Sequence, residues 1–189
     1  ESMRNIYFDE RNKHVSYSKD KIVIDKLPLN IIHAAEISYF FPSAKFILAL
    51  RNPYDVVLSC FMQQFGPNRA TINFTSIEET AKLYDLVMNL WFIYIDKFNL
   101  EIHQIKYENV VKNFELTIKN LLNFLDLEWS EKLLNFNKTA LKRGIINTPS
   151  SSQVNQPLYN KSIDRWKNYE NQFNKVKIIL DKWVVKFNY

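Results

Sequence analysis

The chain has 189 residues, of which 47% are hydrophobic and 15% aromatic, and this composition excludes a disordered tail and predicts a single folded domain over residues 1–189. Its net charge of +5, from 25 basic and 20 acidic residues, contains no dense basic run, so it favours a small anionic ligand over nucleic acid. With one cysteine, no signal peptide and no apolar segment of membrane-spanning length, the sequence predicts a cytoplasmic protein without a membrane partner.

Three short apolar runs rich in β-branched residues predict strands at residues 22–24, 46–50 and 101–107. Patterns typical of helices lie between and after them, at residues 29–41, 53–65, 77–98, 110–125, 130–141 and 171–187. An irregular segment is expected over residues 144–159. The alternation of strands and helices favours an α/β fold, with a parallel sheet flanked by helices and a C-terminal half rich in helices.

Polar residues follow each predicted strand at the point where the strand ends. Lys26 comes after the first strand, Arg51 after the second and Tyr107 at the end of the third. Because the carboxyl ends of parallel strands lie at one edge of a sheet, we expect these three side chains to converge. Two cations and a phenol beside the starts of helices favour an anion such as a phosphate or a sulfate ester.

The junction after the second predicted strand is the most informative. Asn52 is a typical N-cap and Pro53 a typical first residue of a helix. Ser59 lies two helical turns after Asn52, so it shares the face from which Arg51 emerges, and the pair could grip one phosphate. The spacing alone leaves an alternative open, in which Arg51 pairs with a nearby carboxylate and Ser59 is a small packing residue.

Residues 24–30, 41–47 and 51–61, taken in order, resemble the PAPS-dependent sulfotransferases. The pattern is most similar to the bacterial members fused to tetratricopeptide repeats and, more distantly, to the tyrosylprotein sulfotransferases. The similarity continues through residues 106–110 and 148–169. It implies a sulfotransferase fold related to the P-loop NTPases, PAPS as the sulfuryl donor, a hydroxyl of a sugar, lipid or tyrosine as the acceptor, and no metal.

The resemblance also implies a role for each matching residue at the nucleotide. Arg51 and Ser59 would bind the 3′-phosphate of PAPS, for which a planar guanidinium is well suited. Tyr107 would line the nucleotide pocket. Arg165 matches a basic residue of the segment that closes over the donor.

Two further matches lie near the reacting sulfate. Lys26 would stabilise the negative charge that develops on the bridging oxygen, and Ser150 would contact the donor beside the sulfate. The family's glycine-containing loop for the 5′-phosphosulfate has no counterpart before Lys26, since the two glycines, Gly66 and Gly144, come later, and no general base is identified. We therefore expect an N-terminally truncated sulfotransferase that is inactive by itself; the alternatives are a non-catalytic nucleotide-binding or protein-interaction module and, from the basic charge alone, a nucleic-acid-binding domain.

Overall fold

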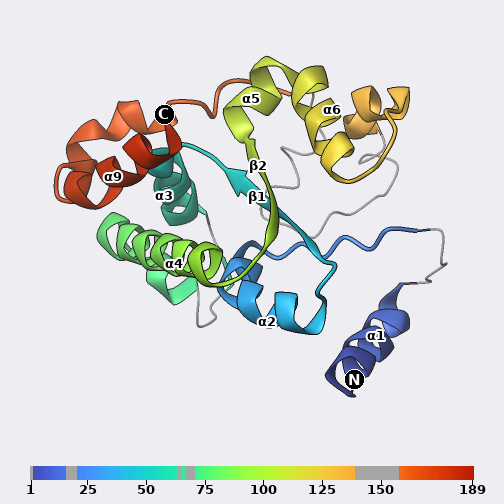
Figure 1. The fold of residues 1–189 in the computed structure, drawn as a ribbon. Coiled ribbons are helices and arrows are strands. Elements are labelled where there is room, and N and C mark those ends of the chain that lie inside the picture. Colours follow the sequence, from blue (N-terminus) through green and yellow to red (C-terminus); the bar gives the residue numbers. More distant parts are fainter. Residues whose placement is uncertain (1, 16–20, 64, 67–70, 139–157) are drawn as a thin grey trace. The chain divides into compact units, whose positions relative to one another are not determined.

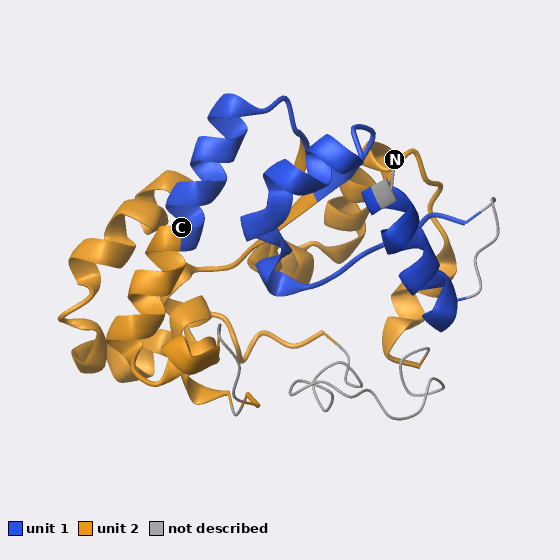
Figure 2. Ribbon diagram, turned by 90° about the horizontal axis from the view of Figure 1, so that it is seen from below, with its two compact units in different colours: residues 1–46, 87–101 blue, residues 47–86, 102–189 orange. Residues whose placement is uncertain are grey.

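A computed structural model describes residues 2–15, 21–63, 65–66, 71–138 and 158–189. The chain divides into two compact units, one formed by residues 1–46 and 87–101 and the other by residues 47–86 and 102–189 (Figure 2). We describe each unit by itself, and the single domain expected over residues 1–189 stays a prediction.

Among the described residues, the sheet consists of two parallel strands, β1 (Lys45–Leu50) and β2 (Glu101–Lys106) (Figure 1). Most of each strand belongs to the second unit. These strands confirm two of the three that the sequence predicts. The prediction of a strand at residues 22–24 is wrong, because residues 22–27 have no regular secondary structure and Ile24 is 72% exposed. β-branched residues form a strand only where a neighbour takes up their backbone hydrogen bonds, and no described residue pairs with this segment.

The first unit contains α1 (Ser2–His14), η1 (Pro28–His33), α2 (Ala34–Phe40) and the second half of α4 (Ile77–Lys97). The helical character predicted for residues 29–41 is confirmed, whereas α1 was not predicted. Tyr7 on α1 makes an edge contact with the ring of Phe41, with centroids 5.1 Å apart. The Tyr94 hydroxyl of α4 donates to the Ile32 carbonyl at 2.9 Å and so ties α4 to η1.

The second unit is built around α3 (Pro53–Met62), the first half of α4, η4 (Arg165–Phe173) and α9 (Lys177–Phe187). In Figure 1, α3 packs beside α9. Their apolar faces form the core with α4, and its buried members are Tyr54, Val57, Leu58, Ile77, Ala81, Phe173, Val176 and Leu180. The amphipathic patterns of α3, α4 and α9 are therefore those of helices with one face against a core.

The remaining elements of the second unit are shorter. They are η2 (Thr71–Phe74), α5 (Tyr107–Lys112), α6 (Phe114–Phe124) and η3 (Glu131–Asn135). The single helix predicted over residues 110–125 is interrupted at Asn113, whose backbone (φ −140°, ψ 61°) is not helical. Of the irregular segment predicted at residues 144–159, residues 144–157 lie outside the described residues.

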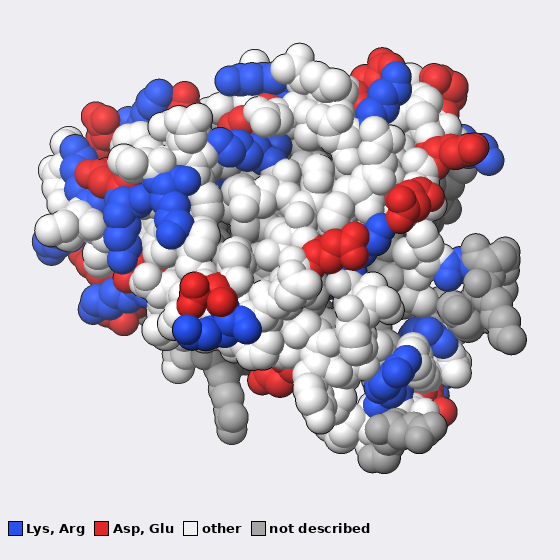
Figure 3. Space-filling view, in the orientation of Figure 1, with Lys and Arg blue, Asp and Glu red and all other residues white. Residues whose placement is uncertain are grey.

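Charges of both signs are mixed on the face of the second unit near α9, at the left of Figure 3. Lys182 pairs with Asp85 at 2.5 Å, and Lys175 pairs with Glu78 at 3.7 Å. A nucleic-acid-binding face would gather lysines and arginines without such partners.

Among the described residues, no helix combines the length and the hydropathy that crossing a membrane requires.

Candidate anion-binding site

The ends of β1 and β2 are joined by one hydrogen bond between the residues that follow them. Asn52 caps α3 by accepting the Tyr54 N–H with its side chain at 3.0 Å, and its own N–H donates to Glu108 Oε1 at 2.9 Å. Glu108 lies in the first turn of α5, directly after Tyr107. The predicted cap is therefore present, and Arg51 and Tyr107 come together at the carboxyl end of the sheet, as a parallel sheet requires.

A pocket of about 130 Å³ opens beside α3 in the second unit. Its polar lining consists of Arg51, Asp55, Ser59, Gln63, Ser162 and Arg165. Two of them, Asp55 and Ser59, belong to α3 and are spaced four apart, so they lie one helical turn after another on one face, and Gln63 follows the end of the helix. Because two guanidinium groups share this pocket with a single carboxylate, the pocket favours an anion.

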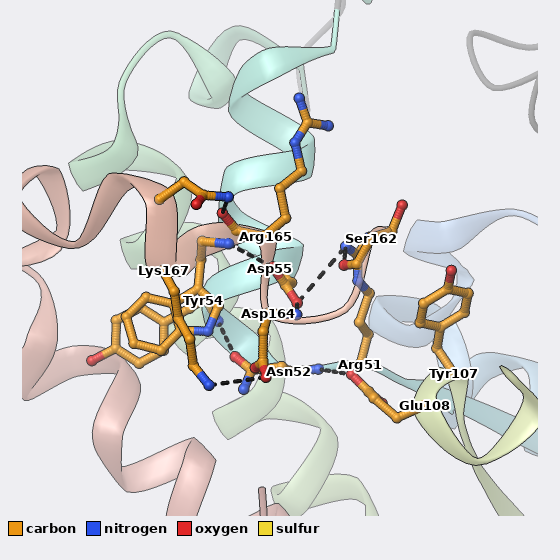
Figure 4. Close-up of polar contacts among 12 residues, drawn as sticks. Arg51, Asn52, Tyr54, Asp55, Tyr107, Glu108, Ser162, Asp164, Arg165 and Lys167 are labelled. Carbon is orange, nitrogen blue, oxygen red and sulfur yellow. Dashed lines mark hydrogen bonds and ion pairs between the residues drawn. The ribbon is translucent and has the colours of Figure 1, made fainter. Parts of the chain in front are cut away.

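Arg51 contributes the most enclosed positive charge of this lining, with 22% of its side chain exposed. Its Nη2 donates to the Ser162 carbonyl, and its guanidinium stands 5.2 Å from the centroid of the Tyr107 ring (Figure 4). The same Nη2 lies 3.9 Å from Asp55 Oδ2, so the carboxylate neighbour considered from the sequence is present, but only at a long distance. Arg51 Nε is buried and has no hydrogen-bond partner among the described residues.

Tyr107 covers one side of this guanidinium. Its hydroxyl donates to the Tyr159 carbonyl at 3.3 Å. Burial raises the pKa of Tyr107, although the nearby charge of Arg51 acts in the opposite direction. Tyr107 is therefore a neutral phenol at physiological pH, which suits a residue that packs and donates a hydrogen bond but does not exchange protons.

Asp55 is buried behind Arg51, and both of its carboxylate oxygens accept hydrogen bonds from backbone N–H groups. Oδ2 accepts from Asp164 at 2.8 Å, and Oδ1 accepts from Trp166 at 2.9 Å. Burial raises the pKa of Asp55, while these hydrogen bonds and the charge of Arg51 act to lower it. An anion in the pocket would thus lie near a carboxylate whose two oxygens already accept hydrogen bonds from the backbone.

Ser59 and Arg165 complete the pocket, and both are exposed. In Figure 4 the Arg165 guanidinium points away from Arg51 and along α3. The start of α3 offers fewer free donors than the sequence implies, since the Tyr54 N–H is taken by the cap and the Asn52 N–H by Glu108. An anion here would therefore be held mainly by side chains and not by the helix N-terminus.

Of the two residues expected near the reacting sulfate, Lys26 is not among the described residues that line this pocket. Lys26 belongs to the first unit, where it is exposed within residues 22–27. Its neighbour Asp25 is held by the Tyr7 hydroxyl at 3.2 Å and the Asn30 amide at 3.3 Å. Ser150 lies outside the described residues.

The structure thus groups Arg51, Ser59 and Arg165 around one pocket and places Tyr107 against Arg51. Sequence reasoning missed Ser162, which contributes only a backbone carbonyl, so its residue type carries no signal. It also did not single out Asp55 as a residue of this pocket.

Other reactive groups do not compete with this site. Cys60 is half-buried next to Ser59, and burial raises the pKa of its thiol to about 11, so it is no nucleophile at neutral pH. Among the residues that the structure describes, no three His, Cys, Asp or Glu side chains come together as a metal site would need.

Comparison with known proteins places this chain in a family. Residues 1–131 match the model of the sulfotransferase family, and the chain therefore belongs to that family. The similarity to sulfotransferases seen in the sequence and the predicted α/β fold are thus confirmed.

Two individual proteins illustrate the relationship. A protein of Aquifex aeolicus (strain VF5), described as uncharacterized, is 30% identical over 190 residues, which cover 93% of this chain and 24% of that protein. The chain therefore spans about a quarter of the length of this relative. The sulfotransferase domain from the curacin biosynthetic pathway has a similar fold, with a TM-score of 0.53 and 16% identity over 88% of this chain and 67% of that one.

Proposed function

We propose that this chain carries the nucleotide-donor site of a PAPS-dependent sulfotransferase, and that the pocket beside α3 holds the 3′-phosphate of PAPS. The observation that carries the proposal is the convergence of Arg51, Ser59 and Arg165 on one pocket. Membership of the sulfotransferase family supports it, and the resemblance seen in the sequence implies that these residues contact the donor.

The residues present fit a phosphate with two negative charges. Guanidinium groups and a serine hydroxyl are donors to phosphate oxygens, and charge-assisted bonds of this kind are about twice as strong as neutral ones. Arg51 is oriented before any ligand arrives, because the Ser162 carbonyl and the Tyr107 ring hold it. Such preorganisation lowers the entropic cost of binding.

The chemistry of the proposed reaction is the transfer of a sulfuryl group from PAPS to a hydroxyl of a sugar, lipid or tyrosine. As in phosphoryl transfer, catalysis would depend mainly on positioning and on stabilising charge at the leaving oxygen. Lys26 is the residue we assign to that charge, and Ser150 the residue we assign to contact with the donor beside the sulfate. Both assignments follow from the family resemblance, and no metal takes part in them.

Calorimetric titration of the chain with 3′-phosphoadenosine 5′-phosphate tests the donor site, and 5′-AMP, which lacks the 3′-phosphate, serves as the control ligand. We expect micromolar binding of the bisphosphate and much weaker binding of 5′-AMP. Arg51→Ala should weaken bisphosphate binding by ~2–4 kcal/mol, because it removes one partner of a charge-assisted pair. Ser59→Ala should cost about 1–2 kcal/mol, because it removes a single hydroxyl donor.

Arg4→Ala is the matched control, since Arg4 lies on α1 over the ring of Phe41 and does not line the pocket. Its affinity for both ligands should equal that of the wild type. Equal bisphosphate affinity for wild type and Arg51→Ala would refute the assignment of the pocket. No 3′-phosphate dependence in the wild type would refute the proposed donor site as a whole.

A further inference from the structure

The buried carboxylate of Asp55 links α3 to the start of η4. None of its side chain is exposed to solvent. Its two oxygens accept the backbone N–H groups of Asp164 at 2.8 Å and Trp166 at 2.9 Å, which lie 109 and 111 residues later in the chain. A single side chain thus fixes both ends of a three-residue turn.

The turn that Asp55 fixes has an unfavourable backbone conformation. Asp164 adopts φ 58° and ψ 19°, in the left-handed region, although it is not a glycine. Non-glycine residues enter this region rarely, and they remain there where the surroundings hold them. The side chain of Asp164 is used elsewhere, in an exposed ion pair with Lys167 at 2.9 Å. The hydrogen bonds to Asp55 therefore hold the backbone of the turn against α3.

This turn positions two groups of the anion pocket. Ser162, two residues before Asp164, accepts the hydrogen bond from Arg51 Nη2. Arg165, directly after Asp164, lines the pocket with its side chain. We propose that Asp55 is a positioning residue of the donor site, which holds the turn of residues 164–166, and with it the neighbouring Ser162, on α3 so that Arg51 and Arg165 line the same anion pocket. This inference rests on the proposed function, because the anion is taken to be the 3′-phosphate of PAPS.

The packing around the turn separates this role from general support of the fold. The Trp166 ring stacks on Tyr54 with centroids 4.3 Å apart and meets the edge of Phe173 at 6.1 Å. These aromatic contacts keep the Trp166 side chain in the core independently of Asp55. Removing the carboxylate should therefore loosen the turn and leave the core packed.

The test uses Asp55→Asn, because asparagine keeps the shape but offers one acceptor oxygen in place of two. Its amide group then faces a backbone N–H donor. We expect about a tenfold or larger loss of affinity for 3′-phosphoadenosine 5′-phosphate and no change for 5′-AMP, measured by calorimetry. Asp181→Asn is the matched control, since Asp181 also meets α3, through the Tyr54 hydroxyl at 2.6 Å, but lies outside the pocket. Asp181→Asn should bind both ligands as the wild type does.

Exposed Asp164 allows the same turn to be changed without touching the buried carboxylate. Asp164→Val should lose about as much bisphosphate affinity as Asp55→Asn, because β-branched residues disfavour positive φ. Adding Asp164→Gly to Asp55→Asn should restore part of the affinity, since glycine enters the left-handed region without steric cost. Such a rescue would not follow from a merely structural role. Because Asp164 is exposed, Asp164→Val tests the inference even if Asp55→Asn fails to fold.

The outcomes are distinct. If the wild type discriminates the bisphosphate from 5′-AMP and both Asp55→Asn and Asp164→Val bind it with unchanged affinity, the inference is wrong and the proposed function stands. If the Asp55→Asn defect is not relieved by Asp164→Gly, Asp55 does not act through the turn and the inference is again wrong. If the wild type does not discriminate the two ligands, the proposed function fails and this role fails with it.

Discussion

The two faces of α9 give a direct test of how the second unit is held together. Leu180 is fully buried, whereas Ile178, two residues earlier on the same helix, is 86% exposed. Leu180 packs in the core cluster with Val57 and Phe173. Leu180→Ala removes three buried carbon groups, worth about 2.4 kcal/mol at ~0.8 kcal/mol each, and the cavity left behind raises the expected loss to about 3–4 kcal/mol. Ile178→Ala should change the free energy of unfolding by less than about 0.5 kcal/mol, because its side chain is already in water.

Equilibrium unfolding in urea, followed by tryptophan fluorescence, measures both variants. For a slope of about 2 kcal/mol per molar urea, Leu180→Ala should lower the midpoint by about 1.5–2 M, and Ile178→Ala should leave it nearly unchanged. The slope itself should stay constant for both, which shows that the change is in stability and not in the compactness of the unfolded chain. Equal losses for the two variants, or a loss below about 1 kcal/mol for Leu180→Ala, would refute the packing of α9 described above.

Three further predictions concern the second unit, two at the ends of the strands and one at the single cysteine of α3. Lys106 donates to the carbonyl oxygens of Phe187 and Asn188 at the end of α9. Lys106→Met should therefore lower the free energy of unfolding by about 1–2 kcal/mol, seen as a lower melting temperature. An unchanged melting temperature would refute the stabilising role of these hydrogen bonds. Glu108→Ala leaves the N–H of residue 52 without its acceptor and should cost about 1–3 kcal/mol in urea unfolding, whereas Glu108→Gln keeps an acceptor and should cost clearly less. Burial raises the pKa of Cys60 to about 11, so alkylation of this single cysteine by iodoacetamide at pH 8 should be about a hundredfold slower than that of a free thiol. The rate should increase as the pH rises. Alkylation at the free-thiol rate would contradict the raised pKa.

Local patterns in the sequence were sufficient to predict much of the second unit. The nearly continuous apolar run before Arg51 became β1, and the Asn52 and Pro53 pair began α3 where the cap was expected. Strand runs, caps and amphipathic periods depend on neighbouring residues, so they can be recognised without knowing the fold. The ordered motifs also led to the family, which the comparison with known proteins confirmed.

The tertiary structure decided what depends on partners distant in the sequence. The apolar residues 22–24 have the composition of a strand, but no described strand pairs with them, so they have no regular secondary structure and are exposed. Arg51 donates a hydrogen bond to a backbone carbonyl 111 residues later in the chain. Because every residue type has a backbone carbonyl, no sequence motif could predict this contact. Asp55 appeared in the sequence as one acidic residue of a first helical turn. Only the packing of residues 162–166 against α3 gave its two oxygens the backbone N–H groups that they now hold.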